Sequence, residues 1–237
     1  KQTLLGVLWV VLQPVISMVI FTFLFGNLLS VPSGEVPYPI FSYAALLPWN
    51  YFSTSLTRSS TSLVGSAHLI TKVYFPRLVI PISGVLAGLI DFAVALVVLI
   101  ALMAWYRIAP TLATLLLPAF LLLAMATALG FGLWLAALNV RYRDINYIVP
   151  YLVQVWMYAT PVVYGTTLIP ERYRFLLALN PMTAVVEGFR WALLGDRLAD
   201  ARVSGSLLAV SIGVALVVLV SGALFFRSTE RTFADII

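Results

Sequence analysis

The sequence predicts an all-α integral membrane protein with six transmembrane helices, a short cytoplasmic helix and a re-entrant helical hairpin on the opposite side. Two observations carry this prediction. Of the 237 residues, 62% are hydrophobic and only 10% are charged, whereas a typical soluble domain is about 25% charged. The apolar residues also form long unbroken runs instead of alternating patterns, which favours helices over a β-barrel. We therefore expect a single transmembrane domain over residues 1–237.

The apolar runs place the six spans along the chain, since a helix needs about 20 residues to cross a bilayer. The first run is too long for the apolar part of a secretory signal peptide, and no small-x-small cleavage site follows it. The predicted spans cover residues 4–29, 40–64, 78–105, 112–138, 147–164 and 207–226.

The second predicted span is the least typical, because it contains Pro48, Asn50 and Arg58 beside many Ser and Thr residues. Such a helix faces protein or water on at least one side. Its aromatic residues admit two interpretations that stay open, a belt at the membrane interface or a surface that faces substrate. These aromatic residues are Phe41, Tyr43, Trp49, Tyr51 and Phe52.

A single acidic residue, Asp91, lies well inside the third predicted span. An ionisable residue in hydrocarbon is costly, so it is either a functional site or the partner of a polar group on a neighbouring helix. We favour the structural pair; under the other interpretation, Asp91 would bind a proton or a cation. Gly84 and Gly88 in the same span, like Ala126 and Gly130 in the fourth, are spaced to let another helix approach closely.

A short mixed segment that includes residues 66–77 joins the second and third spans, and its residues 66–75 could form a helix of two to three turns. Pro76 would end that helix, and the segment carries the cations Lys72 and Arg77. Two interpretations stay open. The segment is either a contact through which an external motor drives the membrane part, or a connecting loop, which is the commoner case.

The connection before the last span has an apolar middle that is too interrupted to cross the membrane. Asn180 and Pro181 divide it into pieces of about ten residues, too short to span, and Glu187 and Arg190 add charge. Residues 168–195 are therefore predicted to form two short re-entrant helices, which need surrounding protein or a water-filled cavity. Asn180 would cap the second helix, with Pro181 in its first turn, and Glu187 would pair with Arg190.

The distribution of cations orients the predicted spans. The termini and the loops after the second and fourth spans hold seven Lys and Arg residues, whereas the two short loops on the other side hold only Arg107. The long connection before the last span does not count in this rule. Both termini and the segment 63–81 are therefore predicted to be cytoplasmic.

The sequence lacks the residues that several kinds of chemistry require. The sequence has no Cys and a single His, His68, without an acidic cluster at ligand spacing, so we expect no metal site. It has no G-x-x-x-x-G-K-[ST] loop for phosphate and therefore no ATP site of its own. It also lacks a Ser-His-Asp set and a carboxylate pair, so we expect no catalytic residue.

Three motifs, in order and over nearly the whole chain, resemble the membrane subunit of ABC-2-type polysaccharide exporters, which move O-antigen, teichoic acid or capsule precursors. Residues 72–77, Lys-Val-Tyr-Phe-Pro-Arg, followed by Pro81, resemble that family's segment between spans two and three. Residues 139–144, Asn-Val-Arg-Tyr-Arg-Asp, resemble its second cytoplasmic turn. Residues 180–190, Asn-Pro-Met-Thr-Ala-Val-Val-Glu-Gly-Phe-Arg, resemble its periplasmic hairpin.

The resemblance implies a type V exporter-like homodimer of six-span permease subunits in the bacterial inner membrane, with two copies of a separate ATPase that binds Mg-ATP. The chain would then not be an enzyme, and would bind no cofactor itself. It would export a lipid-linked polysaccharide through a channel between the subunits. The alternatives are an ABC-2 exporter of a drug or lipid, and a secondary transporter that uses Asp91. The family usually has an amphipathic cytoplasmic helix before the first span, whereas this sequence begins at Lys1, almost in the span. We therefore expect either that the sequence is truncated there or that this second ATPase contact is absent.

The resemblance also assigns roles to residues by position. Contact with the ATPase would fall to Leu69, Lys72, Tyr74, Phe75, Arg77, Arg141, Arg143 and Asp144. The aromatic residues lining the channel would be Phe41, Tyr43, Trp49, Tyr51, Phe52, Trp156, Tyr158 and Tyr164. The periplasmic gate would be formed by Asn180, Pro181, Glu187 and Arg190, and Asp91 would be the intramembrane polar residue.

Overall fold

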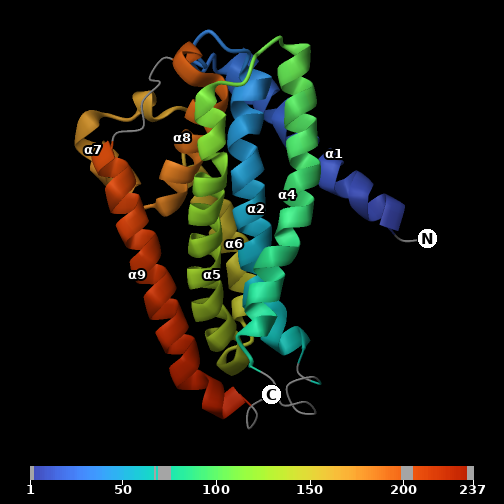
Figure 1. Cartoon of the computed structure of the whole chain (residues 1–237), viewed down its shortest axis with the longest axis vertical. Coiled ribbons are helices and arrows are strands. Elements are labelled where there is room, and N and C mark those ends of the chain that lie inside the picture. The colour runs from blue at the N-terminus through green and yellow to red at the C-terminus, as the bar shows by residue number, and fades with distance from the viewer. Residues whose placement is uncertain (1–2, 67, 69–75, 199–204, 234–237) are drawn as a thin grey trace.

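The computed structural model describes residues 3–66, 68, 76–198 and 205–233, and every regular element within them is helical. Long helices stand side by side in a bundle whose axis is vertical in Figure 1. The helices are α1 (Thr3–Phe21), α2 (Tyr38–Gly65), α4 (Val79–Trp105), α5 (Leu117–Arg141), α6 (Ile145–Ala159), α7 (Glu171–Ala178), α8 (Pro181–Leu194) and α9 (Gly205–Thr229). A π-helical turn, Thr22–Leu28, extends α1, and 3-10 turns cover Leu112–Leu116, Thr166–Leu168, Gly195–Arg197 and Glu230–Thr232.

Four stretches in the described part of the chain are long and apolar enough to cross a membrane, namely Leu8–Leu28, Val79–Trp105, Leu112–Arg141 and Gly205–Thr229. α2 is long enough but more polar. α6 has 15 residues, about 22 Å of helix, which is short of a hydrocarbon core of about 30 Å. The predicted fifth span, 147–164, is helical only to Ala159, because the residue before Pro161 is driven into an extended conformation.

α2 is the central helix of the bundle, which explains why it is polar. It packs along α4 and α5 and also contacts α1, α6 and α8. Its side chains therefore meet protein, as the sequence predicts. The hydroxyls of Tyr43 and Tyr51 donate to the α4 carbonyl oxygens of Ala95 and Val85, each at 3.2 Å. Polar groups in hydrocarbon need such partners, and here one helix supplies them to the next.

α5 and α9 approach closely where two glycines face each other. A Cβ atom added to Gly222 would lie 2.3 Å from the carbonyl oxygen of Gly130. Next to this contact, the rings of Trp134 and Phe225 stack with their centroids 4.7 Å apart. Gly130 therefore lies at a close helix contact, as predicted, since small residues let membrane helices pack backbone to backbone.

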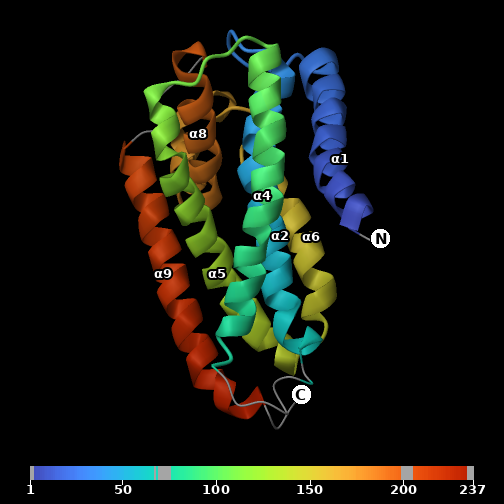
Figure 2. The same cartoon turned by 45° about the vertical axis from the view of Figure 1, so that its right-hand side comes forward.

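The two ends of the bundle carry different elements. α7, α8, the segment after α1 and the connection from α4 to α5 lie at the upper end in Figures 1 and 2. The end of α2, the start of α4, the turn from α5 to α6 and the end of α9 lie at the lower end. The predicted gate segment therefore lies at the opposite end from Arg77 and from residues 141–144, which are the part of the predicted ATPase contact that the structure describes beyond residue 75.

Candidate functional site

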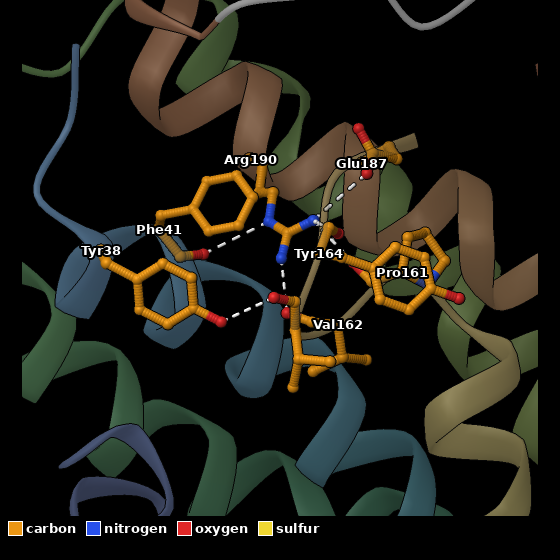
Figure 3. A network of polar contacts seen from close by, with 8 residues as sticks. Tyr38, Phe41, Pro161, Val162, Tyr164, Glu187 and Arg190 are labelled. Atoms are coloured by element: carbon orange, nitrogen blue, oxygen red, sulfur yellow. Dashed lines mark hydrogen bonds and ion pairs between the residues drawn. The ribbon is translucent and has the colours of Figure 1, made fainter. Parts of the chain in front are cut away.

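Arg190 of α8 is a buried cation that organises the upper end of the molecule. Arg190 is only 1% exposed, and Figure 3 shows its guanidinium directed at the backbone that follows α6. It donates to the carbonyl oxygens of Pro161 at 2.6 Å, Tyr164 at 3.0 Å and Val162. Because α6 has ended at Ala159, these carbonyls lack helical partners. The five N–H groups of one guanidinium replace them.

The same guanidinium connects α8 to the start of α2. Its Nε donates to the Phe41 carbonyl oxygen at 3.2 Å, and its centre lies 3.8 Å from the centroid of the Phe41 ring, which is a cation–π contact. Glu187 places its Oε1 atom 3.2 Å from Nη1 of Arg190, which confirms the predicted pair. Tyr38 ties the same region to α2 by donating to the Val163 carbonyl oxygen at 2.6 Å.

Asn180 makes a second connection between α6 and α8. Its Oδ1 accepts from the Met182 N–H at 3.1 Å, so that it caps α8, and Pro181 occupies the first turn, as predicted. Oδ1 also accepts from the indole of Trp156 at 3.0 Å, and Nδ2 donates to the Thr160 hydroxyl at 2.8 Å. The predicted pair of short helices is present as α7 and α8, and the turn between them is held to the last turn of α6.

α6 carries an exposed row of aromatic side chains. Tyr147, Tyr151 and Tyr158 are 83%, 68% and 51% exposed, and with Gln154 they recur at intervals of four, three and four residues, which places them on one helix face. On a membrane protein, such a face meets lipid, a substrate or another subunit. Only Tyr158 is among the predicted aromatic residues. The helical spacing of Tyr147 and Tyr151 is the signal that could have identified the others.

The predicted aromatic residues of α2 lie inside one subunit. Each of the five, Phe41, Tyr43, Trp49, Tyr51 and Phe52, is at most 4% exposed. Phe52 contacts Trp156 of α6 edge to face, with ring centroids 5.0 Å apart. Tyr164 is partly buried and donates to the Tyr158 carbonyl oxygen at 2.9 Å. In this structure these rings build a core, so a channel-lining role for the α2 residues would require α2 to separate from its neighbours.

Asp91 of α4 pairs with Arg58 of α2, with Oδ2 and Nη2 2.7 Å apart. This confirms that Asp91 has a polar partner on a neighbouring helix. The sequence pattern does not by itself identify Arg58 as that partner. Arg58 is a lone cation inside the second apolar run, and this pattern could have identified it as a candidate partner. The two side chains are 43% and 31% exposed in this subunit, and because they lie on apolar helices packed along each other, each provides the other's counter-charge.

Replacing Asp91 by Asn should lower the yield of folded protein while transport is retained. The Asn side chain can still accept from Arg58, but the Arg58 charge loses its counter-charge, and an unpaired Arg in a membrane helix costs about 2.5–3.5 kcal/mol. Thermal unfolding of Arg58→Ala, Asp91→Ala and the double variant should show that the double costs less than the sum. If Asp91→Asn abolished transport at normal yield, and transport by the native protein required a proton gradient, the prediction would be contradicted and a secondary transporter favoured.

The predicted ATPase contact falls partly outside the described residues, which do not include Leu69, Lys72, Tyr74 and Phe75. Arg141, Arg143 and Asp144 are exposed in the turn from α5 to α6, at the lower end of the bundle in Figure 1. Arg77 donates to the Glu230 carbonyl oxygen just beyond α9. Arg77 therefore has an internal role, holding the start of α4 to the end of α9, which the sequence did not reveal.

Comparison with known proteins places the chain in a family. Residues 1–194 match the family described as ABC-2 type transporter. The chain is 33% identical to the O-antigen export system permease protein RfbA of Myxococcus xanthus over 239 residues, which cover 99% of this chain and 89% of that protein. It is 26% identical to RfbA of Klebsiella pneumoniae over 239 residues (100% and 89%). It is also 26% identical to the polysialic acid transport protein KpsM of Escherichia coli over 234 residues (96% and 87%). The chain therefore belongs to the ABC-2 type transporter family.

Proposed function

We propose that this chain is the membrane-spanning permease subunit of an ATP-driven exporter that moves a lipid-linked polysaccharide across the bacterial inner membrane. The cargo would be of the O-antigen, teichoic acid or capsule type. Membership of the ABC-2 family supports a transport role. The printed names of the relatives, O-antigen export and polysialic acid transport, support a glycan cargo.

The exposed tyrosine row of α6 is the observation that best supports a glycan cargo. A sugar ring has apolar C–H faces that pack on aromatic rings, and such contacts let a polymer slide because they fix few strong bonds. The row lies on the surface of one subunit, with Tyr147, Tyr151 and Tyr158 exposed. Two subunits that face each other along α6 would enclose a channel between two such rows.

The complete exporter would be a homodimer with two copies of a separate ATPase, which bind Mg-ATP at the cytoplasmic end. In this topology the single domain 1–237 has six spans and both termini in the cytoplasm. α2 would be the second span, and α6 with the segment to Tyr164 the fifth. α7 and α8 would form the re-entrant periplasmic gate, with Asn180 and Arg190 tying it to α6. The position of α7 and α8 opposite Arg77 and the turn from α5 to α6 supports this arrangement.

This function can be tested by measuring the polysaccharide at the surface of cells whose own permease gene has been deleted. The native chain should restore the glycan at the cell surface. Tyr147→Ala with Tyr151→Ala should lower export by about tenfold or more, because each aromatic contact is worth about 0.5–1.5 kcal/mol. Leu152→Ala with Val155→Ala is the matched control, since these exposed residues lie on α6 beside the row. The ATPase should copurify with both variants.

Two results would contradict the proposal. Full export by the Tyr147→Ala, Tyr151→Ala variant would separate the row from the glycan path. If the native chain restored no surface glycan and altered the efflux of a drug or lipid instead, the cargo would belong to the alternative class of ABC-2 exporter.

A further inference from the structure

A cavity opens between α1, α2 and α4, away from the tyrosine row of α6. Its volume is about 140 Å³, and a cavity of about 150 Å³ can hold a benzene ring, so there is room for a six-membered ring. α1 diverges from the bundle toward its N-terminal end in Figures 1 and 2. The cavity lies where this helix meets α2 and α4, with Pro14, Thr54 and Gly88 among the residues of its wall.

The wall of the cavity presents polar groups that lack partners. Within the described residues, the side chains of Gln13, Asn50 and Thr54, all lining the cavity, make no hydrogen bond. Pro14 has no N–H to donate to the Val10 carbonyl, and both of these residues also line the cavity. Gln13 is exposed and Asn50 and Thr54 are partly buried, so these amide and hydroxyl groups are free to bond to a ligand or to solvent in the cavity.

The charges in the wall cancel each other. Arg58 and Asp91 both line the cavity and are bound to each other at 2.7 Å. An anion such as a phosphate would have to compete with Asp91 for the guanidinium, whereas a neutral hydroxyl group can bond to the outer edges of the intact pair. The cavity therefore favours a neutral, hydroxyl-rich ligand.

Aromatic rings complete the wall from all three helices. Trp9 belongs to α1, Tyr51 to α2 and Phe92 to α4, and the last two rings meet edge to face with centroids 5.8 Å apart. Aromatic faces beside amides, a hydroxyl and an ion pair offer both apolar and polar contacts to one ligand. A pyranose has the matching pattern, because its faces are apolar C–H surfaces and its rim carries hydroxyls.

We propose that this cavity binds a neutral sugar ring of the exported glycan inside one subunit, at a site separate from the α6 row. The assignment to the exported glycan rests on the proposed function. The sugar faces would pack against Trp9 and Phe92, with the buried Tyr51 ring supporting Phe92, and the hydroxyls would bond to Gln13, Asn50 and Thr54.

Photolabelling of the permease–ATPase complex in lipid nanodiscs tests the site directly. The probe is dodecyl β-glucopyranoside with a diazirine next to the headgroup, and dodecyl phosphate with the same diazirine is the comparison. The glucoside should label the peptides that contain Trp9 or Asn50 in a saturable way. Unlabelled dodecyl glucoside should displace it, and dodecyl phosphate should not.

Variants show whether the polar wall recognises the sugar. Asn50→Leu with Thr54→Val should raise the half-saturating glucoside concentration by about fivefold for each lost hydrogen bond. Thr57→Val is the matched control, because Thr57 donates to the Ser53 carbonyl oxygen of its own helix and does not line the cavity. If the double variant does not fold, Gln13→Leu on the exposed face of α1 gives a second test.

The outcomes separate this proposal from the proposed function. Equal labelling by the phosphate probe would overturn the sugar assignment, and labelling that never saturates would overturn a defined site. Saturable glucoside binding with normal export by the Asn50→Leu, Thr54→Val variant would overturn the assignment to the exported glycan and leave a glycolipid headgroup as the ligand. Absence of export by the native chain would instead overturn the proposed function. The photolabelling would still test whether the cavity binds a sugar.

Discussion

Arg190→Ala is expected to destabilise the protein by about 3–5 kcal/mol, the cost of removing one partner from a buried, bonded charge pair. The change strands the carbonyl oxygens of Phe41, Pro161, Val162 and Tyr164, which the guanidinium now satisfies. The connection from α6 to α8 and α2 should loosen. Thermal unfolding in detergent and the yield of folded protein measure the effect.

Conservative variants separate the geometry of Arg190 from its charge. Arg190→Lys keeps the charge but loses the planar fork that reaches several carbonyls at once, so its stability should lie between those of the native protein and Arg190→Ala. If Arg190→Ala unfolded at the same temperature as the native protein, the network would not hold this end together.

Glu187→Ala should raise passive ion leak across proteoliposomes without stopping ATPase binding, because the proposed gate loosens while the cytoplasmic end stays intact.

Gly222→Val should separate α9 from α5 and destabilise the subunit by about 1–3 kcal/mol or more, the usual range for overpacking. The added side chain has no space, because even a Cβ at this position would lie 2.3 Å from the Gly130 carbonyl oxygen and 2.8 Å from the ring of Trp134. Backbone cannot give way as a flexible side chain can. The unfolding temperature and the Trp134 fluorescence should both change.

Gly213→Val is the matched control for this change, since it lies on α9 with no atom within 4 Å of an added Cβ. It should fold as the native protein does. Equal loss of stability in Gly213→Val and Gly222→Val would mean that the effect comes from helix propensity instead of the contact with α5.

The sequence by itself determined the features that depend on neighbouring residues. Long apolar runs predict α4 and α9 almost to their ends, since a membrane helix satisfies its own backbone. The cap at Asn180 and the pair of Glu187 with Arg190 also follow from short spacings, because residues three or four apart meet on a helix whatever surrounds it. The same local chemistry at Pro161 could have shown that α6 ends early.

Only the tertiary structure decided which distant groups meet. A polar residue such as Asp91 signals that its helix faces protein, but periodicity does not name the partner, and Arg58 lies on another helix. The carbonyls bound by Arg190 become available only because a non-helical segment folds against α8. Likewise, the burial of Tyr43 and the exposure of Tyr147 depend on which helices surround each one, since the composition of a helix does not specify its neighbours.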